Sequence, residues 1–409
     1  MIPAHRAWEL LEPHLAPLPA ERLARRSALG RVLAAPLPAT VDVPAEDVSA
    51  MDGFALGGAV SEGTMLPVSA TVAAGDPPGL ELAPATAARI MTGAPVPRGA
   101  DRVVPVELTR EFQENPGGAP GETATFQRCT DAGAHIRRRG EVLRIGNEVL
   151  GDRRLLTPAA LGLLATHGYD SVLVHRAPRV FTLATGDEVV PPEQVPAPGQ
   201  LRDSHTDFLL AAGATLGLRF ESLGIAPDRR HELTELIRQG LAADLLLLSG
   251  GVSMGEFDLV EGVLEELGCR ILFEKVAIQP AKPVVAAVHD GGLVIGLPGN
   301  PASAMVAFWL FVRPVLRRLL GSDDHFWNGA LDAELEAPLP GAKGRDRFLP
   351  AQVATRGGKL FAAPVSPVGS HDLAAYAYGT ALVRIPAHSD PASAGAPCQV
   401  LPLADWPRG

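Results

Sequence analysis

The chain has 409 residues, of which 46% are hydrophobic and 20% charged, so it is long enough for about three domains and is not largely disordered. Its formal net charge of −10 argues against nucleic-acid binding, which needs a basic surface. The widely spaced Cys129, Cys269 and Cys398 exclude a clustered thiolate zinc site. The longest apolar run, residues 304–312, is shorter than the ~20 residues of a membrane helix, and no signal-like region follows Met1. We expect a cytoplasmic protein without nucleic-acid or membrane partners.

Two helices are predicted in the first 35 residues. Apolar residues recur at helical spacing over Ala4–Leu15 and again over Glu21–Ala34. Prolines after residue 35 break this pattern and mark a linker.

Residues 46–149 predict a small antiparallel β domain. Short β-like runs, such as Val68–Ala73 and Arg102–Leu108, alternate there with glycines and prolines. A helix should follow, beginning at Thr157-Pro158 with threonine as its N-cap and extending to Gly168.

Strands and helices alternate from about residue 178 to 323, which predicts βαβ units on a mostly parallel sheet. The expected strands are Val180–Ala184, Leu245–Leu248 and Ile271–Val276, and the expected helices are Phe208–Leu216, Arg230–Ala243 and Leu259–Leu267. Asn300–Leu320 should close this unit as a long helix that Pro314 kinks. Residues 324–409 return to short β runs, which predict a final small barrel or sandwich.

Four segments lie where such sheets bind ligands, at the carboxyl ends of strands. They are Thr185-Gly186-Asp187-Glu188, Ser249-Gly250-Gly251-Val252-Ser253, Gly255-Glu256-Phe257-Asp258 and Gly296-Leu297-Pro298-Gly299-Asn300-Pro301-Ala302-Ser303. Glycine-rich backbone and hydroxyl groups can form a cradle for an anion, because free N–H groups point at it. One such segment alone could be an ordinary strand–helix turn, whereas four on one edge favour an anion site.

Acidic residues crowd the same edge, namely Asp187, Glu188, Asp203 and Asp258. A carboxylate 4 Å from a phosphate oxygen is repelled by about 4 kcal/mol at an effective dielectric of 20. A hard cation between the two groups removes that repulsion, and Mg²⁺ is the usual one. The alternative is that some of these acids only cap helices.

Two lysines and two loops complete the candidate site. Lys275 and Lys282 flank a proline-stiffened strand end, where they either neutralise a second anion or are surface charges. The segments 49–55 and 90–97 are short, kinked and partly polar, so they either turn a corner or reach into a site.

Taken together, these segments resemble the molybdopterin molybdenumtransferase family, which includes the MoeA proteins and the E domain of gephyrin. The resemblance covers essentially the whole chain. The matching blocks, in order, are SAMDGFA, IMTGAPVPRGAD, TGDE, Arg202-Asp203-Ser204, LSGGVSMGEFD, KVAIQPAKP, GLPGNPAS, GRDRF and Gly369-Ser370-His371. TGDE and SGGVS also occur in the related adenylyltransferases, but the ordered set is highly specific.

The resemblance implies a multidomain α/β plus β fold. Residues 1–45 and 150–177 would form an elongated helical domain, and residues 46–149 an inserted β domain. Residues 178–325 would form the molybdopterin-binding α/β domain, and residues 326–409 a C-terminal β-barrel-like domain. The family dimerises, with a site in a cleft to which the partner contributes.

The resemblance also implies the reaction and the residue roles. Family members insert molybdenum from molybdate into adenylylated molybdopterin and release AMP with Mg²⁺, the last step that makes molybdenum cofactor. The catalytic positions would be Asp52, Thr92, Glu188, Asp203 and Asp258, the last three also binding the metal. The pterin and nucleotide positions would be Thr185, Gly186, Asp187, Ser249, Gly250, Gly251, Ser253, Pro298, Gly299, Asn300, Pro301 and Ser303. Molybdate would be held by Lys282, Arg345 and Ser370, to which we add Lys275.

Four residues depart from the family pattern. Val142 stands where an acid is frequent, His205 where asparagine is usual, and Gln279 where lysine or arginine is common. Ala281 replaces a glycine and would need negative φ.

Two other functions compete with metal insertion. A molybdopterin adenylyltransferase would share the cradle but would not need the additional β domains. A non-catalytic molybdopterin-binding scaffold would leave the acidic rim and the lysines unexplained. Further partners would be a molybdopterin adenylyltransferase and the molybdoenzymes that receive the product.

Overall fold

The computed structural model describes residues 1–116, 121–251 and 259–403. Contacts divide the chain into two compact units. The first unit comprises Met1–Ala34, Arg153–Thr157 and Ser171–Gly409, and the second comprises Ala35–Asp152 and Pro158–Asp170. No helix within the described residues is long and apolar enough to cross a membrane.

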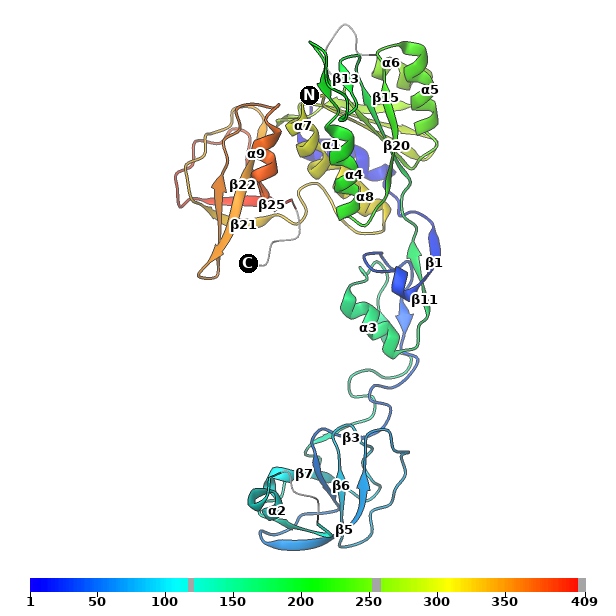
Figure 1. The fold of residues 1–409 in the computed structure, drawn as a ribbon, viewed down its shortest axis with the longest axis vertical. Helices are drawn as coiled ribbons and strands as arrows, with labels where there is room; N and C mark the ends of the chain where they lie inside the picture. The colour runs from blue at the N-terminus through cyan, green and yellow to red at the C-terminus, as the bar shows by residue number, and fades with distance from the viewer. Residues whose placement is uncertain (117–120, 252–258, 404–409) are drawn as a thin grey trace. The chain divides into compact units, whose positions relative to one another are not determined.

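A six-stranded mixed sheet forms the centre of the first unit, with the strand order β15-β12-β16-β20-β19-β17. Two of its strands, β15 and β20, are labelled in Figure 1. Its strands are β12 (Val180–Thr185), β15 (Phe220–Ala226), β16 (Leu245–Ser249), β17 (Arg270–Lys275), β19 (Pro283–His289) and β20 (Gly292–Leu297). The strands from β15 to β20 in this order are parallel, whereas β19 and β17 are antiparallel to their neighbours. The predicted mostly parallel sheet is confirmed, with β17 at its antiparallel edge.

Helices pack on both faces of this sheet. They are α1 (Ala4–Leu11), α4 (His205–Thr215), α5 (Arg230–Gly240), α6 (Val260–Glu266), α7 (Pro301–Ala307) and α8 (Arg313–Leu319). Leu245 and Leu247 belong to the core beneath α4 and α8, and Leu246 and Leu248 to the core beneath α5 and α6. Successive strand residues point to opposite faces, so the four consecutive leucines of β16 can support helices on both.

The predicted long helix over Asn300–Leu320 is interrupted. A π-helical segment, Phe308–Val312, separates α7 from α8. Pro314 lies just after it and has no N–H to donate to a carbonyl of the preceding turn. The irregularity therefore precedes the proline that was expected to kink the helix.

The predicted helix over Glu21–Ala34 is wrong. The chain forms β1 (Ala20–Ala24), which pairs antiparallel with β11 (Ser171–His175), and then a short 3₁₀ turn. Exposed and half-buried residues alternate along β1, as in a strand with one covered face. The helix over Ala4–Leu15 is confirmed only to Leu11, where a 3₁₀ turn containing a proline replaces it.

The C-terminal region is a closed barrel, which confirms the predicted barrel-like domain. Its strands are β21 (Leu331–Leu335), β22 (Asp346–Arg356), β23 (Lys359–Pro364), β24 (Ala381–Ile385) and β25 (Pro397–Pro402). The order β22-β23-β21-β25-β24 is closed by the pairing of β24 with β22. The short strand β18 (Ile278–Gln279) adds to β22 in parallel, and α9 (Leu373–Tyr378) packs beside it.

A five-stranded sheet dominates the second unit, with the order β7-β4-β6-β5-β8. Its strands are β4 (Gly53–Leu56), β5 (Thr64–Val72), β6 (Ala87–Ile90), β7 (Arg102–Pro105) and β8 (Thr123–Phe126). Two small ladders, β2 (Leu37–Pro38) with β10 (Glu148–Leu150) and β3 (Val48–Ser49) with β9 (Ile136–Arg137), and helix α2 (Arg110–Glu114) accompany it. The sheet is mixed rather than antiparallel as predicted, because β5 and β6 are parallel. Helix α3 (Pro158–Thr166) confirms the helix predicted from Thr157-Pro158.

Candidate functional site

Three of the predicted cradle segments meet at one edge of the parallel sheet. Ser249 at the end of β16 is in register with Ala184 of β12 and with Leu297 of β20. The loops that follow these strands begin side by side, and the N–H of Gly250 donates to the carbonyl of Leu297 at 3.2 Å. The sequence prediction that these loops share an edge is therefore confirmed.

Gly250 and Gly251 let the backbone approach Thr185 closely. Both have positive φ, +90° and +61°. A Cβ on Gly250 would lie 2.6 Å from the Thr185 carbonyl oxygen, and one on Gly251 would lie 2.8 Å from Thr185 Oγ1. A side chain at either position would collide with the end of β12, so the loop requires glycine.

Thr185 carries a buried hydroxyl aimed at these glycines. The residue is 4% exposed, and its Oγ1 has no hydrogen-bond partner in the part of the chain that the structure describes. Buried polar groups normally have a partner, so an unpartnered hydroxyl at this point is an exception of the kind that functional sites contain. Gly299 also lies against this point, since a Cβ on it would be 3.8 Å from the Gly250 Cα.

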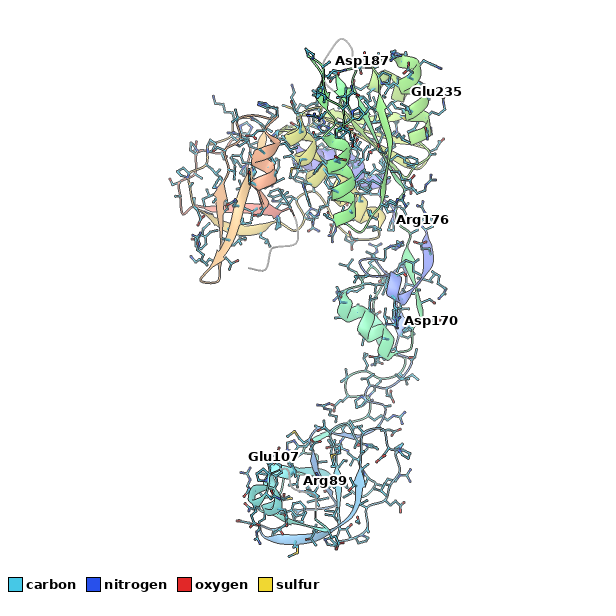
Figure 2. The ribbon with its side chains drawn as sticks, in the orientation of Figure 1. Arg89, Glu107, Asp170, Arg176, Asp187 and Glu235 are labelled. Carbon is cyan, nitrogen blue, oxygen red and sulfur yellow. The ribbon has the colours of Figure 1, made fainter. Side chains whose placement is uncertain are left out.

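The carboxylates of the TGDE block differ in their surroundings. Asp187, labelled in Figure 2, is exposed and exchanges hydrogen bonds with Asp228, each carboxylate accepting from the other residue's N–H at 3.1 and 3.3 Å. Glu188 folds back over Gly186, where a Cβ would be 2.5 Å from its Oε2. Asp187 thus joins two loops, while the Glu188 carboxylate stays at the exposed edge.

Asp203 caps helix α4. It is 7% exposed, and its Oδ1 accepts from the N–H groups of His205 and Thr206 at 2.9 and 3.0 Å. Its Oδ2 accepts from the Thr206 hydroxyl at 2.5 Å. Burial lowers the pKa of His205, against the opposing effect of Asp203, so the imidazole favours its neutral form. Asp203 therefore fits the alternative that some of these acids cap helices.

Two predicted positions, Ser253 and Asp258, lie outside the described residues. Within the described ranges, no group of three or more His, Cys, Asp or Glu side chains is placed to hold a metal ion. Of the predicted metal ligands Glu188, Asp203 and Asp258, the first two are described. The carboxylate of Asp203 accepts hydrogen bonds at the start of α4. The structure does not test this metal assignment.

A cavity of about 420 Å³ lies beside the cradle, between the segment 278–283, the segment 298–303 that leads into α7, and the barrel. We call it the cationic cavity. Its lining includes predicted residues from four motif blocks, Pro298, Asn300, Ser303, Lys282, Arg345 and Ser370. Lys275, the fourth residue assigned to molybdate, is not part of the lining.

The charge of this cavity is one-sided. Lys282, Arg345 and Arg347 line it, and its described lining includes no aspartate or glutamate. Asp346 lies between the two arginines in sequence, but its carboxylate binds Arg384 and the N–H of Ala387. A water-filled space with several cations and no acid attracts anions.

The loop before Lys282 holds the cavity wall in place. β18 and β22 pair Gln279 with Arg347, and the N–H of Val276 donates to the Lys282 carbonyl at 2.9 Å. Ala281 has a φ of +75°, so the expectation that it needs negative φ is wrong. Contacts across the loop keep alanine in a left-handed conformation that glycine adopts without strain.

Asp52 and Thr92 lie together in the second unit. Asp52 Oδ1 accepts from the Thr92 N–H at 2.7 Å and from its hydroxyl at 3.0 Å. These hydrogen bonds, with the more distant Arg89 (Figure 2), hold the pKa of Asp52 below its ordinary value. The two motif blocks meet because β4 and β6 pair there, and Gly53 is required because a Cβ would collide with the Val104 carbonyl oxygen.

Three family models match the chain in sequence order. Residues 2–168 match the MoeA N-terminal region (domain I and II), residues 181–318 a probable molybdopterin binding domain, and residues 332–403 the MoeA C-terminal region (domain IV). The molybdopterin molybdenumtransferase 2 of Mycobacterium tuberculosis is 35% identical over 388 residues, which are 92% of this chain and 93% of that protein. The chain belongs to the molybdopterin molybdenumtransferase family.

Other relatives of this family agree. The molybdopterin molybdenumtransferase of Bacillus subtilis is 34% identical and covers 95% of this chain and 92% of its own length. Two solved structures of the molybdopterin biosynthesis MoeA protein from Pyrococcus horikoshii each have a TM-score of 0.79, at 28% and 22% identity. They cover 99% and 98% of this chain and 100% and 99% of their own. The chain therefore has a MoeA-like fold, while the domain boundaries inferred from sequence stay a prediction.

Sequence analysis of this family member missed Arg347. The GRDRF block pointed to Arg345 alone, although residues 345 and 347 are two apart and β22 begins at Asp346. Both arginines line the cavity, and their presence in one motif block could have suggested the second. Gln279 and Tyr376 also line the cavity, with the buried Tyr376 hydroxyl donating to the Phe348 carbonyl.

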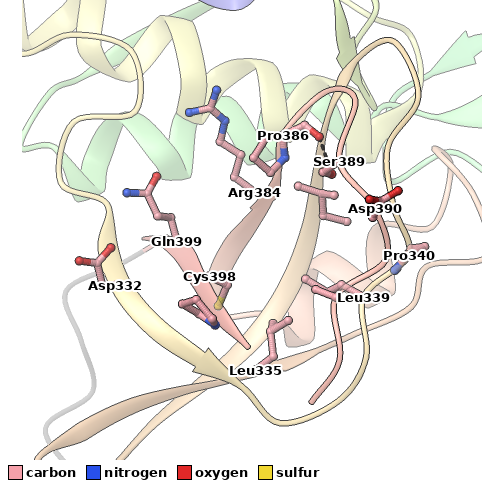
Figure 3. A pocket seen from close by; sticks show the side chains of 13 residues that line it. Asp332, Leu335, Leu339, Pro340, Arg384, Pro386, Ser389, Asp390, Cys398 and Gln399 are labelled. Atoms are coloured by element: carbon pink, nitrogen blue, oxygen red, sulfur yellow. Dashed lines mark hydrogen bonds between the residues drawn. The ribbon is translucent and has the colours of Figure 1, made fainter. Parts of the chain in front are cut away.

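A second cavity, of about 390 Å³, lies in the barrel and contains none of the family motif residues (Figure 3). We call it the barrel cavity. It is lined by apolar residues such as Leu335, Leu339 and Cys398, together with the acids Asp332 and Asp390. Its arginine, Arg384, is bound to Asp346 and stacks over two aromatic rings.

Proposed function

We propose that this chain transfers molybdenum from molybdate to adenylylated molybdopterin, with release of AMP. The observation that carries the proposal is the cationic cavity next to the glycine cradle. Pro298, Asn300 and Ser303 line the cavity, and Gly299 between them lies against Gly250 of the cradle. A pterin phosphate in the cradle and an oxyanion in the cavity would therefore be neighbours.

The residue types suit these two ligands. Molybdate is a tetrahedral dianion, and Lys282, Arg345 and the Ser370 hydroxyl supply cationic and neutral donors from two sides of the cavity. Glycines 250 and 251 lack side chains, so a substrate could approach their backbone closely, with the Thr185 hydroxyl beneath them. Hydrolysis of the phosphoanhydride would add water across the P–O–P bond, releasing AMP and the pterin phosphate. The two thiols of the pterin would form two bonds to molybdenum, and one oxide of molybdate would leave as water with their two protons, without a change of oxidation state.

We further propose Mg²⁺ as the cofactor of this step. Bound Mg²⁺ would offset the negative charge between the enzyme's carboxylates and the substrate's phosphate oxygens. Glu188 and Asp258, the latter outside the described residues, would hold it, and Asp203 would position the adjoining helix through its cap. We propose that the reaction takes place in the cytoplasm and that the enzyme is a homodimer. Sedimentation of the purified protein would test the homodimer.

Molybdenum transfer is favoured over the two alternatives. The family relatives that span nearly the whole chain carry the name molybdopterin molybdenumtransferase. An adenylyltransferase would consume ATP and release pyrophosphate, and a scaffold would release nothing.

The test is AMP release from adenylylated molybdopterin by the purified protein with Mg²⁺, with and without micromolar molybdate, and again with tungstate. Molybdate-dependent release of AMP supports the proposal. Tight binding of the pterin without release, or pyrophosphate production from ATP and molybdopterin, contradicts it.

A further inference from the structure

Arg347 is placed to contact an anion in the cationic cavity. It lines the cavity together with Lys282 and Arg345. Its Cα is paired with that of Gln279 between β22 and β18, so the side chain enters from the barrel next to a neutral residue of the α/β domain. The cavity wall at this point therefore takes its positive charge from β22.

The guanidinium of Arg347 has few partners. Its Nε is buried and has no hydrogen-bond partner among the described residues. One Nη donates to the Gly341 carbonyl at a long distance of 3.5 Å. The adjacent acid, Asp346, is bound by Arg384 instead. No acid of the described lining neutralises the half-buried guanidinium, so an anion in the cavity would bind its accessible Nη groups rather than the covered Nε.

Two other arginines of the barrel show what a structural arginine looks like in this fold. Arg384 is paired with Asp346 and stacked on Phe326 and Trp327. Arg356, on the same strand as Arg347, is paired with Glu336 and stacks on Phe361. Both guanidinium groups are neutralised by an acid, whereas Arg347 faces a cavity whose described lining contains none.

We propose that Arg347 is a third cationic contact for the tetrahedral oxyanion, beside Lys282 and Arg345, and that it sets the affinity of the cavity for that ion. The inference rests on the proposed function and deepens it. A guanidinium presents its donors in a planar fork that suits two oxygens of one tetrahedral ion.

The experiment compares Arg347→Gln with Arg356→Gln, the matched control on the same strand. Tungstate binding to the full-length protein is measured by calorimetry, and the KM for molybdate by AMP release. Arg347→Gln should weaken tungstate binding and raise the KM about tenfold with kcat changed less than about twofold, because one charge-assisted hydrogen bond is lost. Arg356→Gln should leave both within about twofold.

A rescue separates a binding role from a structural one. Gln279→Lys places a cation on the strand paired with Arg347, so the double variant Gln279→Lys/Arg347→Gln should return to within about threefold of the wild-type affinity. Thermal unfolding of each variant checks the fold. If Arg347→Gln does not fold, Arg347→Lys takes its place. This variant keeps the charge but loses the planar pair of guanidinium donors, so its affinity for tungstate should be about threefold lower than that of the wild type.

Unchanged tungstate affinity in a folded Arg347→Gln protein would overturn the inference, as would an equal loss in Arg356→Gln. Failure of the proposed function is distinguishable. If the wild-type protein binds tungstate through Arg347 but releases no AMP, the anion contact holds and the proposed reaction is wrong. If AMP release depends on molybdate but is unchanged by Arg347→Gln, the reaction holds and the role of Arg347 is wrong.

Discussion

The cationic cavity and the barrel cavity are nearly equal in size, about 420 and 390 Å³, but they differ in charge. The cationic cavity has three cations and no acid in its described lining. The barrel cavity has Asp332, Asp390 and one arginine, and that arginine is already bound to Asp346. Volume alone therefore does not identify the site in this protein.

The difference is that charge in the cationic cavity lacks a protein partner. In the barrel cavity the arginine is neutralised within the fold, so nothing is gained by admitting an anion. In the cationic cavity the positive groups repel each other unless an anion enters. The comparison predicts that substitutions in the cationic cavity will change anion binding and anion-dependent activity. Substitutions in the barrel cavity should change neither.

Loss of two cations from the cationic cavity should have the largest effect. Lys282→Gln combined with Arg345→Gln should lower molybdate-dependent AMP release at least about hundredfold, since each charge-assisted hydrogen bond contributes about 1.5–3 kcal/mol. Asp332→Asn in the barrel cavity is the control and should change the rate less than about twofold. Comparable losses from both variants would break the comparison.

Gly250→Ala should destabilise the first unit. The added methyl group would lie 2.6 Å from the Thr185 carbonyl oxygen, and the alanine would have to adopt a φ of +90°. We therefore expect the free energy of unfolding to fall by about 2 kcal/mol or more. Gly358→Ala, at φ +78° with open space around its Cβ, is the matched control and should cost only about 1 kcal/mol. Urea unfolding measures both, and equal losses would mean that the close approach to Thr185 is unimportant.

The thiol in the barrel cavity should be unreactive. Burial, with a smaller contribution from Asp332, raises the pKa of Cys398 to about 11 from its ordinary value of 9.0. At pH 8 the thiolate fraction is then about a hundredfold smaller than in the unfolded chain, and alkylation of Cys398 should slow by about that factor. Peptide mapping after iodoacetamide treatment measures it, and equal rates in folded and unfolded protein would contradict the burial.

The smallest effect is expected at Asp52. Its hydrogen bonds from Thr92 depress its folded-state pKa, so they stabilise the protein at pH values above its unfolded pKa. That contribution is lost as the pH falls through the folded pKa. Thr92→Val removes one donor and should raise the Asp52 pKa toward 3.8 in a carboxyl NMR titration. The stability difference between the two proteins should be fully present at neutral pH and should shrink as the pH falls through the folded-state pKa of Asp52. A pKa unaffected by Thr92→Val would show that the hydroxyl contributes nothing.

The sequence predicted the α/β unit well because its strands contain continuous apolar runs, such as Leu245–Leu248, which a sheet covered on both faces can bury. It failed at Glu21–Ala34, where local helical spacing is overridden by the pairing of β1 with β11, about 150 residues later. A single sequence gives no local signal for a partner so distant along the chain.

The residues of the candidate site were predictable from its motifs, but the hydrogen bonds among them were not. Lys282, Arg345 and Ser370 come from separate blocks and line one cavity, while their roles stay predictions. The cap that Asp203 makes on α4 and the unpartnered Nε of Arg347 depend on side-chain placement. Such contacts arise only once strands and helices have fixed the direction of each side chain.

The central claim is that the cationic cavity holds the oxyanion, and crystals of the protein soaked in tungstate test it most directly. The anomalous signal of tungsten locates the ion without any assumption about turnover. We predict a peak within hydrogen-bond distance of Lys282 and Arg345, with Arg347 as a third contact, and none in the barrel cavity. A peak in the barrel cavity, or an empty cationic cavity in crystals that hold tungstate elsewhere, would contradict the account.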